Sequence, residues 1–373
     1  MNRPPNLTRQ LRRAPTQYLP ILRLASGGMA EVWMADAVFE DGESHPVAIK
    51  RVHPHLTKDP LYRSMFEDEA RLGMALRHPN IVRVYDGREI GDTLIMVMDM
   101  VDGASLKAVL DRARDHGSRL PVPVALFIAR EVAQGLAYAH GATDAQGAPL
   151  EVIHRDVSPH NILLSKQGEV KLADFGLADA KVHETARAAD SVAGKLGYLA
   201  PEEVLSGTSD HRVDLFAVGV VLWEMLAGER LFQVADPKAT VRNVVTKVVP
   251  RLSMESPSPS RKVRVSGEID DLLARLLVRE REKRVPSGEA LVKDLDRLLG
   301  GPEGVAEARR SLALAVGLHC AEGSGDSRPD SLLPERREPL ADLLAAFVDA
   351  VEQDQTDAGA RALNPSDFRL PAT

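Results

Sequence analysis

The apolar pattern of the chain changes near residue 100, and this change limits the folds that it can form. Before that point short β-type runs dominate, with one helical stretch from Tyr62 to Leu76 among them. From Ser105 to Leu299 amphipathic helical segments outnumber strands. The β-type runs are Val32–Ala35, Pro46–Arg51, Val82–Tyr85 and Leu94–Met98, and the helical segments include Pro123–His140, Asp214–Ala227, Ile269–Arg279 and Gly288–Leu299. We therefore expect an α+β protein with a sheet-rich lobe, a helix-rich lobe and a ligand cleft between them.

Composition excludes several classes of protein. The 373 residues are 44% hydrophobic and carry a net charge of −7, so a large core is available and no overall positive charge favours nucleic acid. The single cysteine, Cys320, rules out an internal disulfide and fits a reducing compartment. The longest apolar run, Leu215 to Ala227, is too short to span a bilayer, and no signal peptide begins the chain. We expect a soluble cytoplasmic protein with no membrane partner.

The two ends of the chain differ from its middle. Residues 1–17 contain four arginines and no acidic residue, which predicts a disordered basic tail. Residues 301–373 predict helices around 303–320 and 337–355, separated by a loop-like Gly/Ser/Pro-rich stretch. The second helix carries an apolar stripe of Leu340, Leu343, Leu344, Phe347 and Val351. Because such stripes more often pack on their own protein, padding of the helical lobe is favoured over docking of a partner on the C-terminal helices.

Two candidate ligand-binding motifs lie in the sheet-rich part. Residues 25–32 read Ala-Ser-Gly-Gly-Met-Ala-Glu-Val, a turn with little side chain that lets backbone N–H groups approach a ligand, although alone it would be an ordinary hairpin turn. Residues 47–50 form an apolar run that ends in Lys50, and the helical stretch that follows offers Glu67 and Glu69. These two carboxylates lie about 200° apart around a helix, so only one of them can face the lysine.

Three further motifs carry the strongest chemical signal. The first reads Ile153-His154-Arg155-Asp156-Val157-Ser158-Pro159-His160-Asn161. Asp174-Phe175-Gly176 follows 13 residues after Asn161, and Ala200-Pro201-Glu202 comes next. Chance does not account for these three motifs in this order and at these separations.

From Tyr18 to about Gly300 the chain resembles the bacterial eukaryotic-type (Hanks-type) serine/threonine protein kinases, in particular those of myxobacteria. The resemblance implies an N-lobe over 18–98 with a small antiparallel sheet and one key helix. It also implies a hinge over 99–103, a mostly helical C-lobe over 104–300 and a helical extension over 301–373. It further implies transfer of the γ-phosphoryl group of ATP to Ser/Thr hydroxyls of protein substrates in signalling, with Mg²⁺, or alternatively Mn²⁺, as the metal.

The resemblance assigns roles to individual residues. Asp156 would accept the proton of the substrate hydroxyl, Asn161 and Asp174 would bind the metal, and Lys50 would hold the α- and β-phosphates. Counting back nine residues from His78 makes Glu69 the partner of Lys50, with Glu67 as the alternative. The implied nucleotide contacts are Ala25, Gly27, Gly28, Val32, Ala48, Lys50, Glu69, Met98 as gatekeeper, Asp99 and Val101 in the hinge, Ser105 and Leu163. Only Gly27 matches a glycine of the family's phosphate loop. Asp214 resembles the residue that braces the catalytic loop, and Arg284 the arginine that pairs with Glu202.

Two departures from the family pattern fall at positions that touch each other in the family. Ser158 stands where serine/threonine kinases carry a lysine that contacts the γ-phosphate. Lys195 stands where they carry a threonine that bonds to that lysine and to the aspartate. Our hypothesis is that cation and hydroxyl have exchanged places, so that Lys195 supplies the positive charge that Ser158 lacks; otherwise Lys195 is a surface lysine in a loop.

Regulation and alternative functions are also indicated. Arg155 is typical of kinases whose activation loop is ordered by phosphate, and Thr185 and Ser191 are candidate phosphorylation sites unless Glu184 and Asp190 supply the negative charge permanently. A nucleotide-binding pseudokinase scaffold is the main alternative function. A small-molecule kinase of the aminoglycoside type is disfavoured by the Ala200-Pro201-Glu202 segment. Tyrosine specificity is disfavoured by Pro159, although the missing lysine weakens that argument.

Overall fold

A computed structural model describes residues 15–90, 92–144, 146–175, 195–205, 209–253 and 265–323. These residues form two compact units, each of which is described by itself. The first holds the described residues up to 77 together with 83–100, and the second holds residues 78–82 and the described residues from 101 onwards. The basic tail up to residue 14, the predicted helix around 337–355, Gly176, Thr185 and Ser191 lie outside the described residues.

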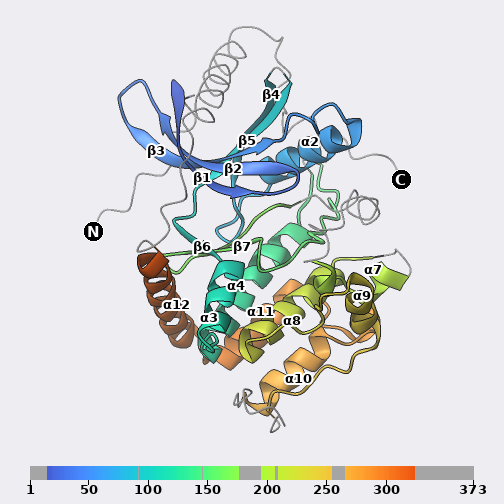
Figure 1. The fold of residues 1–373 in the computed structure, drawn as a ribbon. Helices are drawn as coiled ribbons and strands as arrows, with labels where there is room; N and C mark the ends of the chain where they lie inside the picture. The colour runs from blue at the N-terminus through green and yellow to red at the C-terminus, as the bar shows by residue number, and fades with distance from the viewer. Residues whose placement is uncertain are drawn as a thin grey trace. The chain divides into compact units, whose positions relative to one another are not determined.

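The first unit is an antiparallel sheet of five strands in the order β1-β2-β3-β5-β4 (Figure 1). The strands are β1 (Gln17–Ser26), β2 (Ala30–Val38), β3 (Ser44–Val52), β4 (Val84–Ile90) and β5 (Thr93–Asp99). The register places Trp33, Ile49 and Val97 opposite one another, and these residues belong to a buried apolar layer on one face. The alternate residues Val32 and Lys50 pair on the other face, because successive side chains of a strand point to opposite sides.

Helix α2 (Pro60–Ala75) packs on the face that carries Lys50. Asp59 caps its first turn by accepting a hydrogen bond from the N–H of Leu61, and Pro60 occupies the first helical position, where no N–H is needed. Gly73 allows the helix to approach β4, because a Cβ atom there would lie 2.4 Å from a methyl group of Val84. The sheet and this helix confirm the expected class of the first unit.

The predicted strand over Val82–Tyr85 is wrong at its start, since β4 begins at Val84. The N–H of Val82 donates to the carbonyl of Leu172 at 2.9 Å, and Ile81 forms a parallel bridge with the same residue. Residues 78–82 therefore belong to the second unit. An apolar β-type run does not reveal which sheet it joins.

The second unit is mostly helical. Its helices are α3 (Leu106–Asp115), α4 (Val122–His140), α7 (Pro201–Leu205), α8 (Arg212–Ala227), α9 (Pro237–Thr246), α10 (Gly267–Leu276), α11 (Gly288–Leu299) and α12 (Pro302–Gly323), with 3₁₀ turns η1 (Leu196–Tyr198) and η2 (Arg281–Lys283). A small sheet joins β6 (Gly103–Ser105), β7 (Ile162–Ser165) and β8 (Val170–Leu172). The α+β class inferred from the sequence is confirmed.

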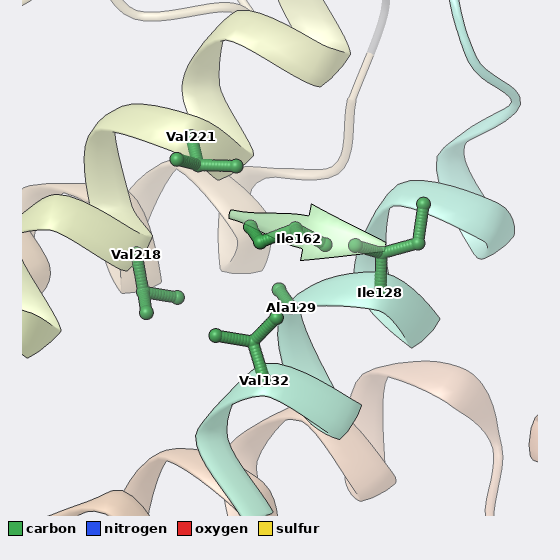
Figure 2. A pocket seen from close by; sticks show the side chains of 6 residues that line it. All are labelled: Ile128, Ala129, Val132, Ile162, Val218 and Val221. Carbon is green, nitrogen blue, oxygen red and sulfur yellow. The ribbon is translucent and has the colours of Figure 1, made fainter. Parts of the chain in front are cut away.

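Helix α8 lies at the centre of this unit, and every residue from Val213 to Ala227 is buried. It packs on α4, which in turn contacts α11. Figure 2 shows side chains of α4, α8 and β7 that line a small packing gap. The gap has no room for a water molecule. Its lining is wholly aliphatic: Ile128, Ala129, Val132, Ile162, Val218 and Val221. Among the described helices, α4 alone is long and apolar enough to cross a membrane, and it is mostly buried in the protein as core helices are.

The first C-terminal helix, α12, packs on other elements of the second unit. Its Ala308, Leu312 and Val316 are buried, and it contacts α4, α11, β6 and β7. Gly168, with φ of 74°, sits in the turn between β7 and β8, where a Cβ atom would lie 2.5 Å from the carbonyl oxygen of Arg309. A side chain at this position would push α12 away from the sheet.

Candidate active site

The site residues of the first unit centre on Lys50. Its Nζ donates to Oε1 of Glu69 at 2.6 Å, and the two side chains are 13% and 5% exposed. Of the two candidate carboxylates on α2, the structure thus places Glu69 against the lysine. A buried ammonium needs such a partner, which also fixes where its other protons point.

Most of the implied nucleotide contacts of this unit share one sheet face. Ala48 pairs with Met98 of β5, next to Lys50, which pairs with Val32 of β2. Ala25 lies opposite Val32 at the end of β1. This face therefore collects small and apolar side chains around the ammonium of Lys50.

Gly27 and Gly28 form the exposed turn between β1 and β2. The Gly27 N–H donates to the carbonyl of Ala30 at 2.9 Å, and its own carbonyl is 2.9 Å from Nε2 of His53. No atom lies within 4 Å of a Cβ placed on Gly28. The turn is thus closed by its own backbone and leaves space at its tip.

The remaining predicted contacts lie at the end of β5 and in the second unit. Asp99 uses its carboxylate to accept a hydrogen bond from the Tyr85 hydroxyl, and burial together with this carboxylate raises the pKa of Tyr85. Ser105 caps α3, because its Oγ accepts from the N–H of Ala108 at 3.2 Å. Leu163 pairs with Ser105 across β6 and β7, and Val101 is half-buried just before β6.

The catalytic-loop motif is held by Asp214 of α8. The carboxylate of Asp214 accepts from the backbone N–H of His154 at 2.8 Å and of Arg155 at 2.7 Å, and it lies 2.8 Å from Nε2 of His140. Burial opposes its ionisation, but the hydrogen bonds and charges of His140 and His154 together outweigh burial and lower the pKa of Asp214. Arg155 has a φ of 55°, a strained value for a side chain of this size, and the ionised carboxylate holds it there.

The carboxylate of Asp156, in the same loop, accepts hydrogen bonds from two side chains. Its Oδ2 accepts from Nδ2 of Asn161 at 2.8 Å and from Nζ of Lys195 at 2.7 Å. The same amide nitrogen of Asn161 also donates to the backbone carbonyl of Asp156 at 2.9 Å. The structure therefore brings together three of the residues singled out in the sequence and orients the carboxylate with two donors.

Ser158 and Lys195 lie in contrasting environments. The side chain of Lys195 is 30% exposed and bonds directly to Asp156, whereas Ser158 is fully buried. Its Oγ has no hydrogen-bond partner among the described residues. The cation that contacts the Asp156 carboxylate thus comes from residue 195.

Asn161 and Asp174 suit a magnesium ion. Asn161 turns its amide nitrogen toward Asp156, so its Oδ1 is the atom that remains to face an ion. Asp174 has a φ of 61°, and the adjacent Phe175 packs on the His154 ring with centroids 4.4 Å apart. The described residues contain no cluster of three or more His, Cys, Asp or Glu side chains for a metal. Mg²⁺ bound together with phosphates needs only one or two protein oxygens, so these two residues fit.

A buried network that the sequence did not reveal fixes the segment after Lys195. Tyr198 donates its hydroxyl to Oε2 of Glu224 at 2.9 Å, and Arg230 lies 3.0 Å from the same atom. Oε1 of Glu224 accepts from the N–H of Leu231 at 3.1 Å. The one available signal was a glutamate inside the apolar run 215–227, which has to find a partner if it is buried.

Glu202 and Arg284 form a buried ion pair close to this network. Their contacts are bidentate, at 2.7 and 3.0 Å, and the arginine side chain is fully buried. Beside it, Glu203 accepts from the N–H of Ala200 at 2.8 Å, and burial raises the pKa of Glu203 to about 7. Two consecutive glutamates thus meet different environments at the start of α7.

Comparison with known proteins agrees with this geometry. Residues 21–295 match the family described as Protein kinase domain. The chain is 36% identical over 284 residues to the tyrosine-protein kinase MasK of Myxococcus xanthus, covering 76% of this chain and 43% of MasK. It is 30% identical to the serine/threonine-protein kinase PrkC of Bacillus subtilis, covering 76% of this chain and 41% of PrkC. This chain therefore spans less than half the length of these two relatives.

A solved structure shows the same fold. The crystal structure of the PknI kinase domain of Mycobacterium tuberculosis matches with a TM-score of 0.53 and 27% identity, over 75% of this chain and 95% of that chain. The family match covers well over half of the chain. The chain therefore belongs to the protein kinase domain family.

Proposed function

We propose that this chain transfers the γ-phosphoryl group of ATP to serine and threonine hydroxyls of proteins. The observation that carries the proposal is the Asp156 carboxylate, oriented by Asn161 and Lys195 at 2.8 and 2.7 Å. Such a carboxylate accepts the proton of an attacking hydroxyl, while positioning and positive charge lower the barrier to transfer. The relatives named as serine/threonine kinases, such as PrkC, support the choice of acceptor.

The steps that we assign to protein residues follow from their chemistry. The substrate hydroxyl oxygen bonds to the γ-phosphorus, its proton passes to Asp156, and the bond from the γ-phosphorus to the oxygen bridging to ADP breaks. Lys50, held by Glu69, orients the α- and β-phosphates. Asn161 and Asp174 would hold Mg²⁺, which when bound neutralises charge on the phosphates.

We assign Lys195 the electrostatic role that the family gives to a lysine at position 158. Its Nζ already contacts Asp156, so it lies beside the oxygen that receives the proton. The charge of an ammonium acts in the same way whichever backbone carries it. The buried hydroxyl of Ser158 adds no charge, and its Oγ has no hydrogen-bond partner among the described residues, so the structure supports the cation half of the proposed exchange and not the hydroxyl half.

Further parts of the proposal concern the chain as a whole. We propose a kinase domain over 18–300, a basic tail over 1–17 and an extension over 301–373, in a cytoplasmic protein. The activation segment, with Thr185 and Ser191, would be read out by Arg155 when it is phosphorylated. Mass spectrometry after incubation with ATP tests this point, and an active enzyme without phosphate on the segment would favour Glu184 and Asp190 instead.

The test of the function is transfer of labelled phosphate from ATP to casein and to a basic histone fraction, followed by identification of the phosphorylated amino acid. Asp156→Asn should abolish the signal, whereas Asp271→Asn, the same change at a side chain 68% exposed, should not. Equal signals from wild type and Asp156→Asn would favour a pseudokinase. If phosphotyrosine is the main product, the acceptor of this chain is tyrosine, as the name of MasK states for that protein, and the serine/threonine assignment is wrong.

A further inference from the structure

One face of the five-stranded sheet is buried, although the helix of that unit packs on the other face. Helix α2 is the one helix among the described residues of the first unit, and it lies on the face of Lys50. The sheet is open, with β1 and β4 at its edges, so it does not close on itself. A sheet buries an apolar face by packing another element against it, so the cover comes from residues outside the described part of this unit. The buried side chains, called the apolar face below, are 0–1% exposed: Trp33, Ala35, Ala37, Ile49, Ile95 and Val97.

The apolar face combines large and small side chains. On β2 and just beyond it, the buried residues at alternate positions are Trp33, Ala35, Ala37 and Phe39. Two alanines thus stand between two aromatic residues. Because protein interiors are close-packed, the space above small side chains is filled by large ones from the covering element. The cover therefore presents large apolar side chains at close intervals.

The cover also has to supply a hydrogen-bond acceptor. The indole Nε1 of Trp33 is buried and has no hydrogen-bond partner among the described residues. A buried tryptophan usually donates this N–H to an oxygen, because an unpaired buried donor is costly. A purely apolar partner does not meet this need, whereas a polypeptide does.

Two parts of the chain, residues 1–14 and 324–373, lie beyond the described residues at its ends. The first contains two leucines, two prolines and four arginines, and it has no apolar stripe. The second contains the stripe of five large apolar side chains between Leu340 and Val351. From Leu340 to Val351 a helix advances about 17 Å, and five paired strands are about 19 Å wide. The stripe thus matches the width of the sheet.

We infer that residues 337–355 form an amphipathic helix that docks on the apolar face through this stripe: Leu340, Leu343, Leu344, Phe347 and Val351. Glu352 and Asp354, at the end of the stripe, offer acceptor oxygens for the N–H of Trp33. The chain from Gly323 to Leu340 can extend about 55 Å, which exceeds the roughly 40 Å diameter of a compact unit of about 200 residues. The stripe then pads the sheet and not the helical lobe that the sequence favours.

The docked helix would support the strands of the candidate active site. Ile49 of the apolar face and Lys50 are neighbours in β3, and Val97 and Met98 are neighbours in β5. Packing on one face therefore fixes strands whose other face carries the nucleotide contacts implied by the family. The inference does not depend on the proposed function, because it concerns packing and not phosphoryl transfer.

Amide hydrogen exchange on the full wild-type chain tests the inference without any substitution. The amides of residues 340–351 should exchange slowly, whereas those of residues 324–336, which connect this segment to α12, should exchange fast. The protection should not depend on protein concentration. Fast exchange throughout 340–351 overturns the inference, and protection that rises with concentration overturns it by assigning the cover to a second copy of the chain.

Variants of the full chain locate the contact. Leu344→Glu should lower the protection of residues 340–351 about 30-fold, since burial of a leucine side chain contributes about 2 kcal/mol. It should also shift the fluorescence of Trp33 to longer wavelength and open it to quenching by acrylamide. Gln353→Glu adds the same charge opposite the stripe and should change neither readout. In a Trp33→Phe background the fluorescence shift should disappear, which separates Trp33 from Trp223.

Other occupants give different results. Loss of protection in Leu344→Glu with unchanged Trp33 fluorescence would mean that the segment packs elsewhere, for example on the exposed Leu314 and Leu318 of α12, and the inference is then wrong. Exposure of Trp33 by Leu11→Glu and not by Leu344→Glu would assign the cover to the N-terminal tail and overturn it equally. If circular dichroism shows that Leu344→Glu does not fold, Leu344→Ala takes its place, with the same direction expected in both readouts.

Discussion

Replacing Lys195 by threonine restores the residue that the family carries at this position, and we predict that it lowers the proposed kinase activity. The Nζ of Lys195 lies 2.7 Å from Oδ2 of Asp156, with 30% of the side chain exposed. Two unit charges about 4 Å apart interact by roughly 4 kcal/mol at the effective dielectric constant near a protein surface. Removing one preorganised donor from a developing negative charge lowers kcat by about 10²–10³-fold.

The assay is kcat with saturating ATP and a protein substrate. Lys50→Met serves as the inactive reference, and Lys195→Arg, which keeps the charge, should retain more activity than Lys195→Thr. The double change of Ser158→Lys with Lys195→Thr should recover at least about ten-fold over Lys195→Thr alone, because a lysine at 158 restores the missing charge. Its stem would enter the space of a buried serine, so circular dichroism must confirm the fold of each variant.

The result that would refute this reasoning is a Lys195→Thr enzyme whose kcat lies within two-fold of wild type while Lys50→Met is inactive. Lys195 would then be a surface lysine that happens to reach Asp156. A double variant no better than the single one would show that position 158 cannot present a cation to this carboxylate.

Three further predictions concern stability, each measured by urea denaturation. Arg284→Met should cost about 3–5 kcal/mol, because it leaves the carboxylate of Glu202 without its buried partner, and adding Glu202→Gln should recover part of the loss. Glu203→Gln should stabilise the protein by up to about 3 kcal/mol at pH 8 and by little at pH 4.5. The reason is that the raised pKa of Glu203, about 7, makes the folded state hold a proton that the unfolded state releases, so wild-type stability falls as pH rises from about 4.5 to 7. Ile128→Ala should cost about 3 kcal/mol by enlarging the aliphatic gap of Figure 2, whereas Lys293→Ala on the surface should change stability by less than 0.5 kcal/mol.

The sequence predicts long, capped helices well and short pairing elements poorly. The predicted helix over residues 288–299 agrees at both ends with α11, because Ser287 caps its start and Gly300, with φ of 80°, ends it. The strands β6, β7 and β8 have three or four residues, too few to show a period. The start of β4 was misplaced because Ile81 and Val82 pair with Leu172, a partner far away in the sequence.

In the candidate site too, contacts within one motif could be predicted, whereas contacts between residues far apart in the sequence could not. Asp156 and Asn161 stand in one motif, and their hydrogen bond spans five residues. The bonds from Asp214 to His140 and from Tyr198 to Glu224 span 74 and 26 residues, and no spacing rule connects their ends. Lys195 and Asp156 are 39 residues apart, and their contact could be predicted only because two departures from the family pattern fall at neighbouring positions.

The long-range contacts of Asp214 and Glu224 explain why the hydrophobic helix α8 carries two buried acidic residues. Asp214 and Glu224 stand ten residues apart on α8, which separates them by about 15 Å along the helix axis. The first holds the catalytic loop through two backbone N–H groups, and the second holds the segment of Lys195 through the Tyr198 hydroxyl. Because α8 is buried along its whole length from Val213, neither acid can move without repacking the core. One buried helix therefore holds both the loop of Asp156 and the segment that follows Lys195, and on this ground we predict that a cation at position 195 substitutes for one at 158.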